Sequence, residues 1–179
     1  MEQEKKLIRY DLACGDSKKE GFTGVDICKT DSVDIVCDLN KYPWTFAEDN
    51  SVDEIFSSMF VEHVGDIVKF MEEIYRILKV GGTCTLIAPY YSSIRCWQDP
   101  THVRAISEAT FLYYNKKWMD ENKLSHYGIK ADFDYTFGYN MDPMWASRSD
   151  EAKSFAVKHY INVVSDIQVV LTKREWNQS

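Results

Sequence analysis

The sequence contains no apolar run close to the ~20 residues that a membrane-spanning helix needs. It contains no C-x-x-C pair, and its five cysteines are an odd set, which disfavours both a disulfide framework and a zinc ribbon. Basic residues are the minority, 21 against 28 acidic ones, and the charge of -7 disfavours non-specific binding to phosphate backbones. The first residues, Met1 to Lys6, are charged and polar, unlike a secretory signal. We therefore expect a reduced, cytoplasmic protein without membrane binding, for which nucleic acid is a disfavoured partner.

Internal repeats, low-complexity tracts and Pro/Gly/Ser-rich linkers are absent as well, so nothing marks a boundary inside the chain. A length of 179 residues suits one domain. Apolar residues make up 45% and aromatic residues 14% of the chain, which supplies a core and excludes global disorder. We expect a single domain over residues 1–179, and the sequence leaves a homo-oligomer open without indicating one.

The apolar segments are short and separated by polar turns, as are the buried strands of parallel sheets. Strands are expected at residues 7–12, 22–27, 33–37, 54–58, 83–88, 130–139 and 167–172. A helix is expected over Asp66–Lys79 and a C-cap at Gly81-Gly82, because apolar residues recur there at i, i+3 and i+4. Further helices are expected from Ser107 and over Ser149–Tyr160. Strands that alternate with helices in the first half indicate an α/β fold, a Rossmann-like doubly wound sheet of seven strands, mostly parallel with an antiparallel edge strand.

Ligands of such a sheet bind beyond the carboxyl ends of its strands. The first strand ends in Asp11-Leu12-Ala13-Cys14-Gly15, where small residues let backbone amides approach a ligand closely. The second ends at Asp26, whose carboxylate can accept hydrogen bonds from two ribose hydroxyls. Asp38 follows the third strand, and Glu62-His63 follow the fourth. This ordered set predicts a nucleoside site, although a purely structural turn is the alternative interpretation of the first motif alone.

The nature of the nucleoside ligand follows from what surrounds the first turn. A dinucleotide needs G-x-G-x-x-G and a helix whose N-terminus holds the pyrophosphate. Here the third glycine is missing, Asp16 adds negative charge, and barely one helical turn fits between Gly15 and Gly21. S-adenosylmethionine (SAM) has a sulfonium cation, an ammonium group and no phosphate, so nearby carboxylates favour it.

Three motifs in residues 7–90 resemble those of class I SAM-dependent methyltransferases: Asp11–Gly15, Gly24–Ile27 and Cys37–Leu39. Asp53–Val64 resembles the fourth strand of that family, and Glu73–Gly82 its following helix and turn. The chain is similar to the methyltransferase type 11 group in which the first helix is short. Two departures are Ala13, where the first glycine usually stands, and Met59, where many relatives have a polar residue.

The resemblance implies the cofactor SAM, with S-adenosylhomocysteine as product, and a residue-by-residue set of contacts. Asp11, Ala13, Cys14 and Gly15 would line the methionine end, and Asp26 would bind the ribose. Ile27 would pack on the adenine, and Asp38 with Leu39 would meet the adenine edge. Met59 and Phe60 would form the floor between cofactor and acceptor, and His63 would complete the cofactor set.

A long segment over residues 89–104 follows the fifth strand, and a second over 139–150 follows the sixth. Long loops that are too aromatic for disorder are usually functional, so both are expected over the active-site face. In the first, His102 is the candidate general base, with Arg104 for substrate positioning and Tyr90 as a further catalytic candidate. The alternative is that His102 and Arg104 merely anchor the loop, since methyl transfer can proceed by alignment alone.

A metal site made by Glu62, His63 and His102 is disfavoured at this stage. Adjacent residues on a helix point about 100° apart, which makes a poor chelate, so we expect no metal and a structural pair instead.

The sequence therefore predicts a SAM-dependent methyltransferase that acts on a small-molecule or conjugated acceptor by in-line displacement. A SAM- or S-adenosylhomocysteine-binding protein without transferase activity shares every motif and stays open. A nicotinamide-dependent reductase is a second alternative, against which the first turn argues, and nucleic-acid methylation is disfavoured by the acidic pI of about 5.1.

Overall fold

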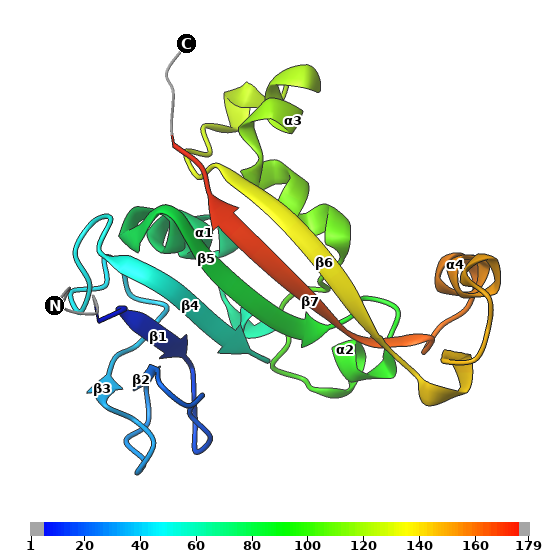
Figure 1. Cartoon of the computed structure of the whole chain (residues 1–179), viewed down its shortest axis with the longest axis horizontal. Helices are drawn as coiled ribbons and strands as arrows, with labels where there is room; N and C mark the ends of the chain where they lie inside the picture. The colour runs from blue at the N-terminus through cyan, green and yellow to red at the C-terminus, as the bar shows by residue number, and fades with distance from the viewer. Residues whose placement is uncertain (1–5, 176–179) are drawn as a thin grey trace, which may run out of the picture.

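Seven strands form one sheet in the computed structural model, which describes residues 6–175 (Figure 1). In chain order they are β1 (Arg9–Leu12), β2 (Thr23–Asp26), β3 (Ile35–Val36), β4 (Val52–Ser58), β5 (Leu78–Pro89), β6 (Phe133–Met141) and β7 (Val164–Lys173). Their order across the sheet is β3-β2-β1-β4-β5-β7-β6. The first five strands pair in parallel, and β7 runs antiparallel to both β5 and β6. The predicted fold class is confirmed, with the β7–β6 pair as the antiparallel addition at one edge.

Four α-helices and four 3-10 helices connect these strands. The α-helices are α1 (Ile67–Ile77), α2 (Ile94–Gln98), α3 (Lys116–Glu121) and α4 (Asp150–His159). The 3-10 helices are η1 (Val61–His63), η2 (Glu108–Tyr114), η3 (Ser125–Tyr127) and η4 (Pro143–Trp145). The segment expected to be helical from Ser107 is therefore a 3-10 helix, and the helix predicted over 149–160 is α4.

Helix α1 is amphipathic, and its end differs from the prediction. The Asp66 side chain accepts a hydrogen bond from the Lys69 amide (3.1 Å) and so caps the start of the helix. The helix ends at Ile77, because Leu78 is already extended and pairs with Val52 as the first residue of β5. The Gly81-Gly82 pair is no C-cap but lies in β5, near an irregularity in its pairing with β4.

The predicted alternation of strands and helices in the first half is wrong for the three connections before β4. Residues 13–22, 27–34 and 37–51 contain no helix. Some of their amides bond to side chains instead: Lys19 N to Asp11 (2.7 Å) and Asn40 N to Asp38 (3.1 Å), for example. Such local side-chain acceptors compete with helical hydrogen bonding. The short first helix that the resemblance implied is thus reduced to a loop.

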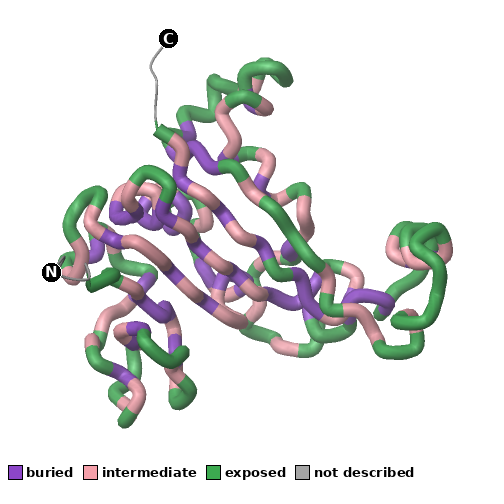
Figure 2. The backbone as a smooth tube through the Cα atoms, in the orientation of Figure 1, coloured by how far each residue is buried: buried purple, intermediate pink, exposed green. Residues whose placement is uncertain are grey.

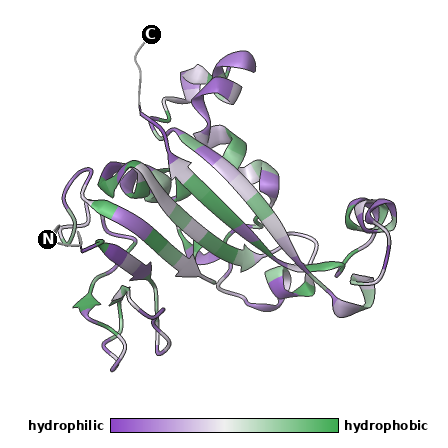
Figure 3. Ribbon diagram, viewed as in Figure 1, coloured by the Kyte–Doolittle hydropathy of each residue, from purple (hydrophilic) through white to green (hydrophobic). Residues whose placement is uncertain are grey.

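The core lies on one face of the sheet. Cys84, Leu86 and Ala88 of β5 are buried there together with the apolar residues of α1, η2 and α3. On the opposite face Thr83, Thr85 and Ile87 stay partly exposed, because among the described residues no helix packs over them (Figure 2). In Figure 3 edge strand β6 is mostly pale or purple, as suits a strand in contact with water.

The two segments expected to be loops over one edge of the sheet are partly ordered. Residues 89–104 contain α2, and Tyr90 forms a bridge with Ile106. Residues 139–150 begin inside β6 and continue through η4 toward α4, which projects away from the sheet (Figure 1). Asn162, between α4 and β7, contacts the first segment: its amide donates to Ser92 O (3.0 Å) and its side chain accepts from Ile94 N (2.6 Å). Within residues 6–175 no helix has the length and apolarity that crossing a membrane requires.

Candidate active site

The strand order of the sheet reverses between β1 and β4, which is the switch point at which open α/β sheets bind ligands. Two non-glycine residues adopt left-handed backbone conformations there, directly after those strands: Ala13 (φ 57°) and Met59 (φ 55°). Such a conformation costs an L-residue about 1–2 kcal/mol, and strain of this kind clusters at functional sites. The other non-glycine residues with positive φ in the described chain, Asn50, Lys123 and Asn162, lie in exposed turns. The strain therefore marks the switch point as the candidate site.

The turn after β1 is held against the end of β2. The Ala13 and Cys14 amides both donate to Val25 O, at 2.7 and 3.3 Å. Gly15 also has a left-handed conformation (φ 53°), and its amide donates to Asp26 Oδ2 at 3.0 Å. Asp26 Oδ1 accepts from the Cys28 amide at 2.9 Å. Each carboxylate oxygen has two lone pairs, so Asp26 keeps one on each oxygen for a further donor.

The loops after β1 and β2 are joined to each other. Thr30 Oγ1 donates to Gly15 O and Ser32 Oγ donates to Asp16 O, both at 2.8 Å. A side chain at Gly24 would place its Cβ 2.4 Å from Ser32 O, so only glycine allows this approach. The buried Asp11 carboxylate accepts from the Lys19 amide at 2.7 Å, and burial raises the pKa of that carboxyl. The Asp11 side chain therefore fixes the loop that follows β1.

The predicted adenine contacts lie in different environments. Ile27 is 60% exposed at the end of β2, which leaves an apolar surface beside Asp26. Asp38 accepts from the Asn40 amide (3.1 Å) and lies 3.4 Å from Lys41 Nζ. Leu39 is buried in the core, where its carbonyl accepts from Trp44 Nε1 (3.3 Å). Ile27 thus offers a surface to an aromatic ligand, whereas the Leu39 side chain belongs to the core.

Met59 and Phe60 directly follow β4 and lie next to the switch point. The Met59 amide donates to Ile87 O of β5 at 2.8 Å, which fixes its strained backbone. Phe60 is half-buried, and its ring packs edge-on against Phe70 of α1 at 5.8 Å. The next residues form η1, which brings Glu62 and His63 to the same edge of the sheet.

Glu62, His63 and His102 form a compact cluster at this edge. Each offers a ligand atom, and these three atoms all lie within 4.8 Å of one another. The two imidazole rings are in contact, with ring centres 4.7 Å apart. The His102 side chain is 9% exposed, and its Nε2 lies 3.9 Å from Glu62 Oε1. From the sequence, the side chains of the adjacent Glu62 and His63 were expected to point too far apart to bind one ion. In this structure they do not, because their ligand atoms lie close together.

The Glu62 carboxylate is buried, and no other residue forms a hydrogen bond with it. The residue is 1% exposed, and neither carboxylate oxygen has a hydrogen-bond partner in another residue. Burial raises the pKa of this carboxyl, while a hydrogen bond from the backbone of Glu62 itself and the two neighbouring histidines lower it. Only the Glu62 backbone is tied, its carbonyl accepting from the Val103 amide at 2.9 Å.

The two other catalytic candidates make contacts inside the protein. The Tyr90 hydroxyl donates to Glu108 Oε2 at 2.9 Å, the residue is 1% exposed, and burial raises the pKa of its phenol. Arg104 Nη2 donates to two backbone carbonyls, Val64 O (2.6 Å) and Gly65 O (2.9 Å). Both residues thus anchor the segment after β5, the role that the sequence left open as an alternative for Arg104.

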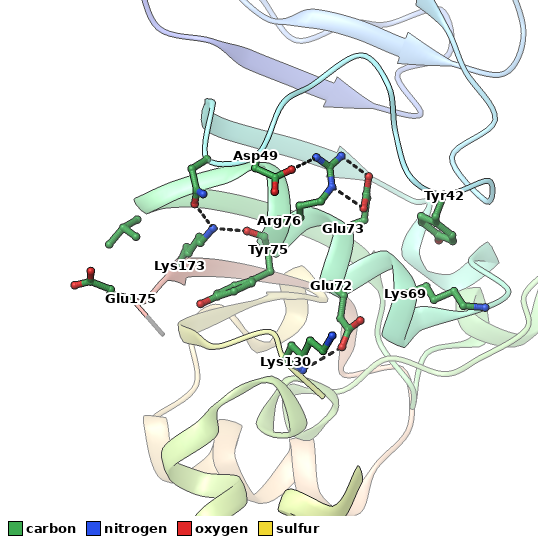
Figure 4. Close-up of a pocket in the computed structure, with 12 residues that line it drawn as sticks. Tyr42, Asp49, Lys69, Glu72, Glu73, Tyr75, Arg76, Lys130, Lys173 and Glu175 are labelled. Atoms are coloured by element: carbon green, nitrogen blue, oxygen red, sulfur yellow. Dashed lines mark hydrogen bonds and ion pairs between the residues drawn. The ribbon is translucent and has the colours of Figure 1, made fainter. Parts of the chain in front are cut away.

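A cavity of about 970 Å³ lies elsewhere, at the edge where β4 and β5 begin (Figure 4). The side chains that line it are largely paired with one another, as Arg76 is with Glu73 and Asp49. Lys173 donates to Asn50 Oδ1 and to two backbone carbonyls there. The cavity is remote from the switch point and brings none of the predicted site residues together.

Sequence reasoning missed two contributors to the site, Thr30 and Ser32, which join the two loops. It named Glu62 but not the burial of its carboxylate. The hydroxyl residues carry no signal in the sequence, because their partners are backbone carbonyls of another loop. Glu62 had a signal in its position directly after a strand end.

Comparison with known proteins shows what this chain and its fold resemble. Residues 14–86 match the family model of a methyltransferase domain, and no curated protein matches the chain in sequence. The solved structures with a similar fold include a SAM-dependent methyltransferase from Archaeoglobus fulgidus (17% identity, TM-score 0.63, 93% of this chain and 86% of that one). The YcgJ protein from Bacillus subtilis (17% identity, TM-score 0.56, covering 96% and 94%) is similar as well. So is a SAM-dependent methyltransferase from Mesorhizobium loti (14% identity, TM-score 0.54, covering 94% and 91%). The resemblance stated from the sequence motifs is confirmed.

Proposed function

Because residues 14–86 match a methyltransferase domain and the whole sheet has the fold of class I methyltransferases, we propose that this chain is a SAM-dependent methyltransferase with a small-molecule or conjugated acceptor. The observation that carries the proposal is the pair of strained residues, Ala13 and Met59, on either side of the switch point. The family match covers only residues 14–86, and the segments after β5 lie outside it. The match therefore does not assign the acceptor.

The residues at the switch point fit SAM. The Gly15 turn has open space where a side chain would stand, so a ligand can approach its backbone. Asp26 retains a lone pair on each carboxylate oxygen, which suits the two vicinal hydroxyls of a ribose. Ile27 offers an exposed apolar surface next to that carboxylate for the adenine ring. No group at this turn provides the dense set of donors that a pyrophosphate needs, and Asp16 and Asp26 repel one.

When bound, SAM supplies an activated methyl group on a sulfonium, which needs little further chemistry from the protein. The task of the chain is then to align the acceptor and exclude water. Met59 and Phe60 stand where the cofactor and acceptor regions meet. His102 stays the candidate for removing a proton from the acceptor, provided that its Nε2 is free to accept one.

The experiment that tests the cofactor is calorimetric titration of the purified chain with SAM and S-adenosylhomocysteine, with NAD as comparison. We expect binding of the first two only. Replacing Asp26 by Ala should weaken SAM binding by about 1.5–3 kcal/mol, the scale of lost hydrogen bonds to a charged group. The matched control is Asp31→Ala, an exposed carboxylate in the loop that follows β2, which should leave the affinity unchanged.

The outcomes separate the alternatives. NAD binding stronger than SAM binding would support a nicotinamide-dependent reductase and overturn the proposal. An unchanged SAM affinity in Asp26→Ala would remove Asp26 from the site. Methyl transfer to the components of a cell extract is followed with radiolabelled SAM. Tight SAM binding without any such transfer would favour the non-catalytic binding protein.

A further inference from the structure

We propose that Glu62, His63 and His102 form a binding site for a divalent transition metal, with Zn²⁺ as the best match. The observation behind it is a buried, unpartnered carboxylate that faces two imidazole rings, all three ligand atoms lying within 4.8 Å of one another. This inference does not rest on the proposed function, because metal binding is measured without SAM or an acceptor.

The hydrogen bonds around the cluster leave metal-ligating nitrogens available. His102 Nδ1 lies 2.9 Å from Cys96 O, a carbonyl that can only accept, so Nδ1 carries the proton. The lone pair of His102 is therefore on Nε2, the atom 3.9 Å from Glu62 Oε1. A metal-bound histidine commonly donates its other ring N–H to a carbonyl in this way.

His63 is oriented by a comparable chain of contacts. Thr101 Oγ1 donates to Asp99 Oδ1 at 2.7 Å, so its own oxygen is left to accept from His63 Nδ1 at 3.0 Å. The Thr101 carbonyl lies 3.3 Å from the same nitrogen. Both partners thus place the proton on Nδ1 and the lone pair on Nε2 of His63. Asp99 and Thr101 act as positioning residues, because they fix the ring without belonging to the three-ligand cluster.

The environment of the Glu62 carboxylate favours a bound metal ion over an ion pair with His102. A buried carboxylate with no hydrogen-bond partner in another residue is costly, and a protonated His102 stabilises it poorly because 3.9 Å is beyond hydrogen-bond reach. Two histidines and one glutamate match a known zinc ligand set, in which bond lengths are ~2.0–2.2 Å. Ligand atoms around such an ion lie roughly 3.3 Å apart, so metal binding would draw this cluster together modestly. Three protein ligands leave a coordination position for water or for an oxygen of a small molecule.

Glu62 and His63 lie in η1, immediately after β4, and His102 comes from the segment after β5, so the site lies at the edge of the sheet that carries the switch point. While a metal occupies His102 Nε2, that nitrogen cannot accept a proton. The metal site and the general-base role of His102 are therefore mutually exclusive in the loaded protein.

The test is calorimetric titration of chelator-stripped protein with zinc chloride. We expect one Zn²⁺ per chain, and at least a tenfold loss of affinity in each of Glu62→Gln, His63→Ala and His102→Ala. Matched controls are His126→Ala and His159→Ala, two exposed histidines outside the cluster, which should bind zinc like the parent chain. No zinc binding by the parent chain, or equal affinity in all five variants, would overturn the proposal.

Cobalt separates this site from the free cysteines and from loss of folding. Co²⁺ bound by nitrogen and oxygen in a four-coordinate site absorbs strongly in the visible range without the near-ultraviolet band of thiolate ligation. We expect that spectrum in the parent chain, whereas a thiolate band would assign the metal to cysteine and overturn the proposal. Circular dichroism identifies any variant that fails to fold. If Glu62→Gln is such a variant, the two histidine variants and the Co²⁺ spectrum decide the outcome.

Discussion

Arg76 joins helix α1 to the 37–51 connection through more side-chain hydrogen bonds than the neighbouring Glu73, which accepts from the Trp44 amide. Its guanidinium donates to both oxygens of the buried Glu73 (2.6 and 3.0 Å) and to Asp49 (2.5 Å), as Figure 4 shows. It also donates to the backbone carbonyls of Trp44 (3.0 Å) and Ala47 (3.3 Å). The hydrogen bonds to Glu73 raise the pKa of Arg76 above its usual range, so the guanidinium stays charged.

Replacing Arg76 by Met should lower the free energy of unfolding by about 2–3 kcal/mol, because Glu73 is left buried without its cation. Urea denaturation followed by circular dichroism measures this loss. Arg76→Lys keeps the charge but not the planar fork, so we expect an intermediate loss. A change below about 0.5 kcal/mol in Arg76→Met, the range of ordinary surface substitutions, would contradict this account.

Single residues also show where sequence reasoning reaches its limit. Asp26 could be found from sequence because it ends a strand, and strand ends are recognisable from apolar runs. The left-handed backbone of Met59 could not, since nothing in the residue type requires a positive φ. Glu62 lay in a recognised position, but its burial depends on the segment after β5 folding back over it.

At the scale of elements, all seven strands were predictable and several helix boundaries were not. A strand signal is local, since four or five apolar residues between polar turns suffice. The end of α1 is decided by tertiary pairing instead: Leu78 continues the helical pattern but pairs with Val52 in the sheet. The missing helices before β4 reflect connections that side-chain hydrogen bonds hold in loop form.

Gly24 decides whether the loops after β1 and β2 can pack together. A Cβ at this position would lie 2.4 Å from Ser32 O and 2.8 Å from Cys14 Sγ. We expect Gly24→Ala to lower the free energy of unfolding by about 1–3 kcal/mol, as overpacking does. The same change should weaken SAM binding, because the Gly15 turn is held by these loops.

Gly138→Ala is the matched control, since nothing lies within 4 Å of a Cβ there and Gly138 is exposed in edge strand β6. Thermal unfolding with and without SAM measures both effects. Equal stability of the two alanine variants would show that the backbone approach at Gly24 is not needed.

On the scale of the whole molecule, the topology followed from simple rules. Parallel strands, a reversal of order after the third strand and a final antiparallel pair describe the observed sheet. In the excursion over residues 142–163, the sequence predicted helix α4 but not the path of the chain around it, because the excursion buries little. In this excursion Ala156 and Val163 are the buried residues, whereas Met144, Phe155 and Ile161 are more than half exposed.

This excursion should be dispensable for folding of the sheet. Asp142 and Val163 already pair through the Asp142 amide and Val163 O (2.9 Å), so an Asn-Gly turn can replace residues 143–162. We expect cooperative urea unfolding with a loss of about 1–2 kcal/mol, mainly from the contacts of Asn162 with residues 92 and 94. Asn162→Ala in the full chain measures separately the part of this loss that comes from the Asn162 contacts. Failure of the shortened chain to fold would instead make the excursion part of the core.

The helix-free connection between β1 and β2 has a thermodynamic consequence for ligand binding. Its ten residues, 13–22, are held by a few side-chain to backbone hydrogen bonds rather than by a regular element. Amide hydrogens in such a segment exchange through low-energy local openings. A ligand that binds to the segment suppresses those openings, and the ordering of the segment offsets part of the favourable interaction energy. Binding at this turn should therefore combine a favourable enthalpy with an unfavourable entropy, and slower amide exchange over residues 13–22.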